Sequence, residues 1–286
     1  GQSSRVSSSV IVTNLIFEGA GHTEDHGLDP DMLRVTGESN DVWIHKNSFI
    51  NTGDAAFDVK VGGYNTTISF NRLVDVLRAS LHGSSDSRVI NQQITTTLHN
   101  NMFITTDAFY SRGRSTLRRV PLLRRGASHH FNNVYVDYWK DIASVRVGGT
   151  LHWEDNLFVG LDAVQNEDSD LADAFSKWQV ELSDGVVRDG SFTDDGSIVQ
   201  FANGNCRLDS SYRTGYSGDP GNARNLSLDY SGTSLQTIAN RQMTPNQDLL
   251  DYVNATAGVG GATPYNSPIA KSRAQVLAMS QPDCKR

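Results

Sequence analysis

A short pattern of apolar and polar positions recurs along the chain: an apolar residue, two spacers, an asparagine, one spacer and a second apolar residue. Its first copies are Ile11-Val-Thr-Asn14-Leu-Ile16 and Ile44-His-Lys-Asn47-Ser-Phe49. The asparagines of the six copies are Asn14, Asn47, Asn71, Asn101, Asn133 and Asn156, separated by 33, 24, 30, 32 and 23 positions. Each follows a strand-like run and turn residues fill the gaps, so the pattern predicts repeating units of short strands.

A ragged repeat of strand-sized units predicts an all-β solenoid, a right-handed parallel β-helix with C-terminal loops and short helices packed on it. We expect the recurring asparagine to occupy a turn between two sheets in the left-handed conformation and to bond the asparagine of the next coil. The interior should hold stacks that include Ile11, Ile44 and Ile68, with Phe17, Phe49 and Phe103 nearby. An antiparallel sandwich also has short strands, but it does not explain an asparagine at one strand-relative place.

The pattern fades after about Gln165, and we expect a single domain over 1–286 with regular coils over 1–165 and irregular coils, loops and a tail over 166–286. Gly1-Gln-Ser-Ser indicates a processed or trimmed start, and strands begin by Val10 without a helix before them. An uncovered first coil exposes apolar core and strand edges. Either the native chain is longer or a partner covers this end, and we expect a monomer unless another chain covers it.

Four later segments carry their own signals. Leu171–Trp178 predicts one or two helical turns, and 191–230, rich in Gly, Ser, Asp and Asn, predicts long loops. Asn246–Val253 and Ser267–Met279 predict helices, the latter starting with Ser-Pro as a cap and first turn. This tail should pack on the flank of the solenoid or cover its C-terminal end.

Composition and charge exclude some classes of protein. With 37% hydrophobic residues, a mean hydropathy of −0.41 and no run near the ~20 apolar residues of a membrane span, no membrane partner is expected. The net charge of −7 argues against nucleic-acid binding as the main role. The two cysteines, Cys206 and Cys284, form one disulfide that ties the tail to the body, or are two free thiols. Sequons at Asn65, Asn225 and Asn254 are compatible with a secreted protein.

Two pairs of carboxylates lie between residues 29 and 60: Asp29 with Asp31, and Asp54 with Asp58. On a strand, Asp54 and Asp58 share one side. Four like charges this close repel one another, and a hard divalent cation such as Ca²⁺, which prefers oxygen ligands, would remove that cost. The alternative is four solvated loop aspartates that never meet.

A basic stretch follows in this acidic protein, with six arginines around Val120-Pro121-Leu122-Leu123: Arg112, Arg114, Arg118, Arg119, Arg124 and Arg125. Arg78 precedes this stretch and Arg146 follows it on a predicted strand. Such a cluster is either a solvated face or a receptor for a polyanion, whose carboxylates would bridge the cation and pair with guanidinium groups.

These motifs, in order, are Asp29-Pro-Asp31-Met-Leu-Arg-Val, Val42-Trp-Ile, Asp54-Ala-Ala-Phe-Asp58-Val-Lys60, Leu81-His-Gly-Ser-Ser-Asp86 and Arg119-Val-Pro-Leu-Leu-Arg124. They resemble those of pectate lyases of polysaccharide lyase family 1, over about Val10 to Gly160. The resemblance implies a parallel β-helix that is secreted, binds Ca²⁺ and cleaves polygalacturonate or pectin by β-elimination.

The resemblance also implies roles for residues that match the family motifs. Asp29, Asp31, Asp54 and Asp58 match the calcium ligands. The catalytic positions are Arg119, as the base, with Arg78 and Arg124, and the substrate-binding positions are Lys60, Arg78, Arg124 and Arg146. Two departures stand out, because Arg78 replaces a lysine of the family, and Trp43-Ile-His45-Lys46 replaces its Trp-Ile-Asp-His signature.

Other functions remain open from the sequence: a lyase for methylated pectin or another uronate polymer, a non-catalytic carbohydrate-binding solenoid, or a glycoside hydrolase that uses two of the aspartates as acid and base. The histidines are further candidates. His22, His26 and His82 are candidates for acid–base or metal roles, and His22 and His26 flank Glu24 and Asp25 in the manner of a metal site. The His129-His130 pair is also a candidate, but it is expected to be packed or stacked.

Overall fold

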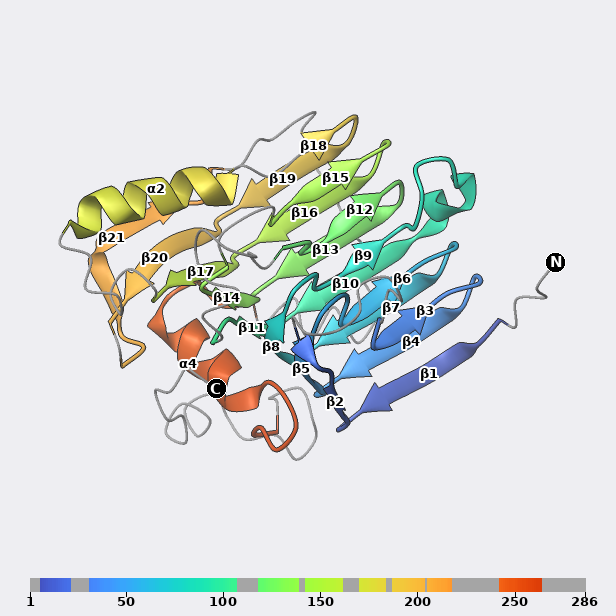
Figure 1. The fold of residues 1–286 in the computed structure, drawn as a ribbon, viewed down its shortest axis with the longest axis horizontal. Helices are drawn as coiled ribbons and strands as arrows, with labels where there is room; N and C mark the ends of the chain where they lie inside the picture. Colours follow the sequence, from blue (N-terminus) through green and yellow to red (C-terminus); the bar gives the residue numbers. More distant parts are fainter. Residues whose placement is uncertain are drawn as a thin grey trace.

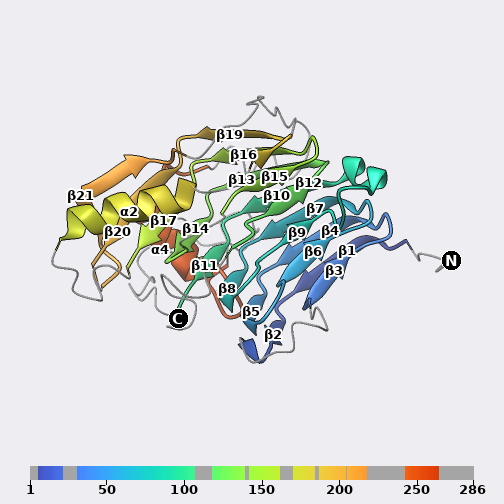
Figure 2. The ribbon, with the colours of Figure 1, turned by 45° about the horizontal axis from the view of Figure 1, so that its top comes forward.

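Three parallel β-sheets wind around one core in this computed structural model, which describes residues 6–21, 31–106, 118–138, 142–161, 170–183, 187–203, 205–217 and 242–263. Among the described residues, every coil but the last contributes one strand to each sheet in the same order, so neighbours within a sheet come from successive coils. Figures 1 and 2 show the strands stacked side by side along the long axis. The predicted right-handed parallel β-helix is confirmed.

We call the sheets A, B and C. Sheet A consists of β1 (Ser8–Thr13), β4 (Asn40–His45), β7 (Tyr64–Ser69), β10 (Thr95–His99), β13 (Ala127–Phe131), β16 (Thr150–Glu154) and β19 (Ser191–Asp195). Sheet B consists of β2 (Ile16–Glu18), β5 (Ser48–Thr52), β8 (Arg72–Val76), β11 (Met102–Ile104), β14 (Val134–Val136), β17 (Leu157–Gly160), β20 (Ile198–Ala202) and the antiparallel β21 (Leu208–Gly215). Sheet C consists of β3 (Leu33–Val35), β6 (Phe57–Val59), β9 (Leu81–His82), β12 (Leu122–Arg124), β15 (Ser144–Arg146) and β18 (Val187–Arg188).

Asparagines form a buried ladder at the turn from sheet A to sheet B. The Oδ1 of Asn71 accepts hydrogen bonds from the backbone N–H of Asn47 at 2.9 Å and from its Nδ2 at 3.1 Å. The same pair of bonds joins Asn71 to Asn101, Asn101 to Asn133, and Asn133 to Asn156, at 2.9–3.1 Å. Each rung therefore satisfies a backbone donor of the preceding coil, as the sequence pattern predicted.

Two details of the predicted ladder are wrong by one residue. The register pairs Thr13 with His45, so that Leu15, and not Asn14, occupies the place of Asn47 in the first coil. The left-handed conformation belongs to the residue before each rung, such as Lys46 with a φ of 55°. The side chain of each ladder asparagine points into the solenoid. The residue before it adopts the left-handed conformation and makes the tight turn between the two sheets.

Aromatic and aliphatic side chains fill the interior in columns. Phe17 stacks on Phe49 with ring centroids 4.8 Å apart, and Tyr135 stacks on Phe103 at 4.7 Å and on Phe158 at 4.8 Å. The predicted columns are confirmed for Ile44 and Ile68, which are fully buried. Ile11 was placed wrongly: it is 63% exposed because Val12, its neighbour, is the partner of Ile44. A shift of one residue on a strand reverses the face.

Two helices and a hairpin occupy the C-terminal part. α2 (Leu171–Ser183) confirms the first predicted helix and extends it, and its buried Trp178 donates from Nε1 to the Tyr138 carbonyl at 3.1 Å. α4 (Gln247–Thr256) confirms the second, with Asn246 as its N-cap. Residues 267–279 lie outside the described part of the chain. The prediction of loops over 191–230 is wrong for 191–215, where β19, β20 and β21 form because apolar side chains between the small residues enter the core: Phe192, Val199 and Phe201.

The side chains just before the ladder rungs hold the described part of the C-terminal segment on the flank of the solenoid. They point outward, because the rungs point inward. The contacts are Lys46 Nζ to Gly261 O at 2.6 Å, Phe70 against Tyr252, Asn132 with the backbone of Met243, and Asp155 with Gln242. Helix α4 lies beside the strands of sheet B (Figure 1), and its apolar residues Leu249, Leu250 and Val253 share a buried cluster with Met102 and Val134 of that sheet. Among the described residues, no helix is long and apolar enough to cross a bilayer.

We predict that Asn101→Ala lowers the free energy of unfolding by roughly 2–4 kcal/mol, because it leaves buried donors of Asn71 without their acceptor. Chemical denaturation at pH 7 measures the change. Asn14→Gly is the matched control, since Asn14 lies outside the ladder and glycine suits its φ of 57°, and it should cost less than about 0.5 kcal/mol. Equal losses in the two variants would contradict a stabilising ladder.

Candidate active site

Sheet C gathers the charged residues that the sequence analysis selected. Its strands are short and lie in register, so an outward residue on one strand faces the matching residue of the next coil, about 4.8 Å away. Arg34 pairs with Asp58, and Arg124 pairs with Arg146. Arg119 and Arg78 precede β12 and β9, and the Ser80 N–H donates to the Arg119 carbonyl at 2.9 Å. The stacking of coils thereby assembles residues that are far apart in the sequence.

Two buried carboxylates share one ammonium group. Nζ of Lys60 lies 2.6 Å from Oδ2 of Asp31 and 2.6 Å from Oδ2 of Asp58, and the two aspartate side chains are 1% and 2% exposed. Arg34 adds a second cation, with its Nε 2.5 Å from Asp31, and the Leu81 N–H donates to Oδ1 of Asp58 at 2.8 Å. Loop 31–32 and strands β3 and β6 thus place two acids from successive coils against each other.

Burial has the largest effect on the protonation of Asp58. Burial raises the pKa of Asp58 to about 7, and the negative charge of Asp31 adds to the rise, although Lys60 opposes it. Burial alone would lower the pKa of Lys60, but attraction to Asp58 and Asp31 outweighs that effect and raises it. A buried carboxylate that retains a proton near neutral pH beside its ammonium partner is a place where a further cation would be stabilised.

Asp54 belongs to a second, adjoining group. Its Oδ1 lies 3.3 Å from Nη1 of Arg78 and 4.0 Å from Nη1 of Arg119. Burial lowers the pKa of Arg119, and the neighbouring guanidinium of Arg78 lowers it further, while Asp54 acts in the opposite direction. The backbone of Arg119 is left-handed, with a φ of 63°, followed by a cis peptide bond between Val120 and Pro121. The Arg119 side chain thus approaches the same carboxylate as Arg78.

The predicted calcium ligands are therefore only partly gathered. Asp31 and Asp58 meet at Lys60, Asp54 meets the two arginines, and Asp29 lies outside the described residues. In the described part of the chain, Asp31, Asp54 and Asp58 do not form a set whose oxygens all lie within 4.8 Å of one another. Their oxygen-only donor set and the raised pKa of Asp58 still suit a hard cation, which would compete with Lys60 for the carboxylates.

Cations outnumber acids across this surface. Arg34, Lys60, Arg78 and Arg119 face the three described aspartates, so the group carries net positive charge when all are ionised. Farther along sheet C, Arg124 extends this charge, with its Nε 2.6 Å from Oδ1 of Asp86 and its Nη1 3.1 Å from the Gly83 carbonyl. The result is a row of positive charge across successive coils, which matches a linear polyanion.

Two residues of this site were not given roles from the sequence. Arg34 alternates with Leu33 and Val35, and this alternation is the signal that places it on the same outer face as Asp58. Asp86 holds Arg124 across 38 residues of sequence, a contact that no local pattern indicates.

The remaining candidates lie elsewhere. His82 is fully buried inside the solenoid, where its Nε2 lies 2.7 Å from Ser80 Oγ, and burial lowers its pKa to about 3. His130 is also buried inside, whereas His129 lies on the outer face of sheet A. His22 and His26 lie outside the described residues, as does Cys284, so the disulfide with Cys206 stays a prediction.

Comparison with known proteins points to one family. A family model described as pectate lyase matches residues 4–203. Pectate trisaccharide-lyase from a Thermotoga species is 33% identical over 132 residues, covering 44% of this chain and 33% of that protein. The chain thus spans about a third of the length of that curated relative.

Solved structures agree in fold. Pectate lyase C from Erwinia chrysanthemi, solved with Ca²⁺, has a TM-score of 0.57 at 20% identity, with 91% of this chain and 68% of that chain covered. Pectate lyase II from Xanthomonas campestris has a TM-score of 0.54 at 21% identity, with 88% and 70% covered. At these identities the likeness shows the shared β-helix.

Removal of the shared ammonium by Lys60→Met should destabilise the fold by roughly 1–3 kcal/mol at pH 8, and less at pH 5. Without Lys60, the pKa of Asp58 in the folded protein rises further above its value in the unfolded chain. A carboxyl with a raised pKa in the folded state lowers the free energy of unfolding as pH rises through that range. Denaturant unfolding at both pH values tests this. The control is Lys177→Met, since Lys177 pairs with Asp173 on the exposed face of α2, and its effect should be small at both pH values. A Lys60→Met loss that grows toward acid pH would contradict the arrangement.

Proposed function

This chain belongs to the pectate lyase family, and we propose that it is a secreted lyase that cleaves polygalacturonate by β-elimination. The observation that carries the proposal is the Arg119 guanidinium beside Asp54 and Arg78, with its pKa lowered, next to the Asp31–Lys60–Asp58 group. In this proposal, a base and a receptor for anionic sugars lie next to each other. An enzyme that cleaves such a polymer meets its substrate outside the cell, which is consistent with secretion.

The reaction removes the proton on C5 of a uronate residue, forms a double bond between C4 and C5, and breaks the bond from C4 to the glycosidic oxygen. The C5 proton is weakly acidic, so the reaction needs a base and positive charge near the sugar carboxylate. Arg119 would take the proton. Its lowered pKa increases the fraction of neutral guanidine, although this fraction stays small at neutral pH.

Cationic side chains would bind and orient the polymer. Lys60, Arg78, Arg124 and Arg146 lie on sheet C or beside it, and each offers a charged donor to a sugar carboxylate. Arg78 replaces a lysine of the family, so its planar guanidinium can bond two acceptors where an ammonium is a point charge. Asp86 would fix the direction of Arg124 through the 2.6 Å contact with its Nε.

Calcium would be held by Asp31 and Asp58, with Asp54 and Asp29 as the further candidates. Bound there, the ion would supply positive charge that neutralises a sugar carboxylate and acidifies the adjacent C–H bond. The ion would compete with the ammonium of Lys60 for Asp58 and, below a pH of about 7, with a proton on that carboxyl. Without methyl esters the substrate keeps the charges that this surface matches, which favours pectate over methylated pectin.

Incubation with polygalacturonate should raise ultraviolet absorbance as unsaturated ends form, and a calcium chelator should suppress the rise, because Asp31 and Asp58 would lose their ion. Added Ca²⁺ should restore it. Formation of reducing ends without absorbance would replace the proposal with hydrolysis, and binding without either signal would replace it with a carbohydrate-binding solenoid. Faster reaction on highly methylated pectin would contradict the proposed substrate.

Arg119→Ala should lower kcat by roughly 10²–10⁴-fold, the usual contribution of a general base, and should change KM little. Wild-type activity should rise with pH into the alkaline range, because more of Arg119 becomes neutral. The control is Arg207→Ala, since Arg207 pairs with Asp251 far from sheet C and its loss should leave activity unchanged. A fully active Arg119→Ala, or an activity maximum at acid pH, would assign the base to another group.

A further inference from the structure

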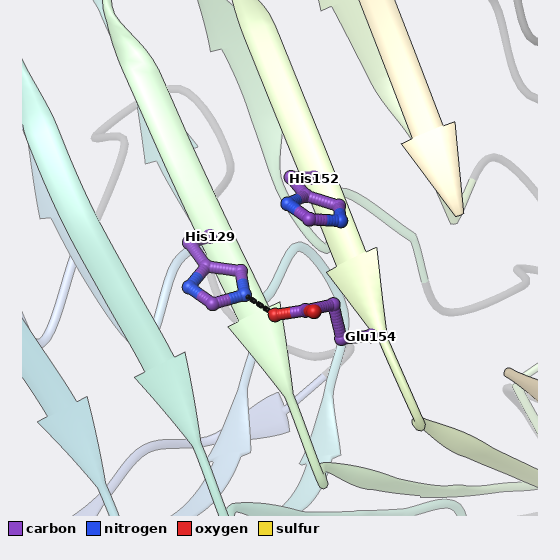
Figure 3. A group of neighbouring side chains, drawn as sticks. All are labelled: His129, His152 and Glu154. Atoms are coloured by element: carbon purple, nitrogen blue, oxygen red, sulfur yellow. Dashed lines mark hydrogen bonds and ion pairs between the residues drawn. The ribbon is translucent and has the colours of Figure 1, made fainter. Parts of the chain in front are cut away.

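Sheet A carries a second group of ionisable side chains, unrelated to the charged surface of sheet C. His129 on β13 and His152 on β16 are partners in register, and their rings stack with centroids 5.1 Å apart. Glu154 lies two residues beyond His152 on the same face of β16 and makes a short contact through Oε2 with Nε2 of His129. Figure 3 shows the three side chains grouped between the two strands.

We propose that His129, His152 and Glu154 bind a divalent transition-metal ion such as Zn²⁺, which clamps two coils of the solenoid together. One ligand atom from each residue lies within 4.8 Å of the others. A tetrahedral zinc site with bonds of about 2.1 Å brings its ligand atoms to about 3.4 Å from each other, so modest side-chain rotations close the site.

The chemistry of the donors selects the class of metal. Two imidazoles and one carboxylate suit zinc and its neighbours, whereas calcium prefers oxygen donors alone. Burial lowers the pKa of His129 and the hydrogen bond from His129 lowers the pKa of Glu154, so the ring is neutral and the carboxylate ionised near pH 7. These are the forms that ligate a metal, which would replace the proton shared by His129 and Glu154.

A second carboxylate stands in the place that orients a metal-bound histidine. Oδ2 of Asp195, on the next strand β19, lies 3.0 Å from Nε2 of His152. An outer carboxylate of this kind fixes the ring and raises its basicity, and the metal would then bind His152 through Nδ1. The histidines are buried, but Glu154 is 29% and Asp195 is 65% exposed, so an ion can reach the group from solvent.

The test is titration of the chelator-treated full chain with ZnCl₂ in excess CaCl₂, followed by calorimetry. We expect one Zn²⁺ per chain, a rise in melting temperature on binding, and visible d–d absorption when Co²⁺ replaces Zn²⁺. His152→Gln and Glu154→Gln should each weaken Zn²⁺ binding at least tenfold.

Two controls locate the site. His45→Gln changes another histidine of sheet A, and Asp58→Asn changes the proposed calcium site, and both variants should bind Zn²⁺ as the wild type does. Absence of stoichiometric binding to the wild type, or undiminished binding in both His152→Gln and Glu154→Gln, overturns the proposal, as does loss of binding in His45→Gln. If the ligand variants do not fold, the absorption spectrum of the wild type with bound Co²⁺ tests the proposal instead. A spectrum without the bands of nitrogen ligands also overturns the proposal.

Discussion

The hydrogen bonds between successive asparagines are the constraint on which the rest of this molecule depends. At each turn from sheet A to sheet B, a buried backbone N–H needs an acceptor in the next coil. The backbone N–H groups of Asn47, Asn71, Asn101 and Asn133 each find it in the side-chain oxygen of the following asparagine. The turn fixes the register of the strands on either side, and register decides which side chains enter the core. The alignment of charges on sheet C follows from the same register.

Much of this fold could be predicted from the sequence because each coil repeats the same types of residue at the same positions. Asparagine before an apolar residue marked the coils, and alternating apolar positions marked the strands. The one-residue error at Asn14 arose because Leu15 takes the ladder position in the first coil, and asparagine suits both the ladder and the left-handed turn beside it. The strands within 191–215 were missed because their apolar residues are sparse among Ser, Asp and Gly, and only packing on α2 and the preceding coils favours a strand there.

The candidate site was less accessible to sequence reasoning than the fold. Motif resemblance selected Asp31, Asp54, Asp58 and Arg119, and the structure places Asp58 on sheet C and the other three just before strands of that sheet. How they are divided, with Asp31 and Asp58 sharing Lys60 while Asp54 faces two arginines, depends on side-chain directions that no spacing encodes. The contact between His129 and His152 could not be predicted for a related reason. The two residues are 23 positions apart, and they are neighbours because that coil has the same length, which the sequence pattern does not fix. Within one strand, His129 stacks on His152 outside the core while His130 lies against the core residue Trp153.

The asparagine ladder also has a direction. Each amide nitrogen donates one hydrogen bond to a backbone carbonyl of the preceding coil and one to the side chain of the later coil, and among the described residues no bond between two side-chain amides runs the other way along the ladder. The last of these donors, on Asn156, ends on the hydroxyl of Ser197 at 3.4 Å. Aligned amide dipoles polarise one another, so the chain of bonds grows stronger toward its middle and is weakest at its two ends. Fraying should accordingly start at the terminal coils and travel inward, one coil at a time.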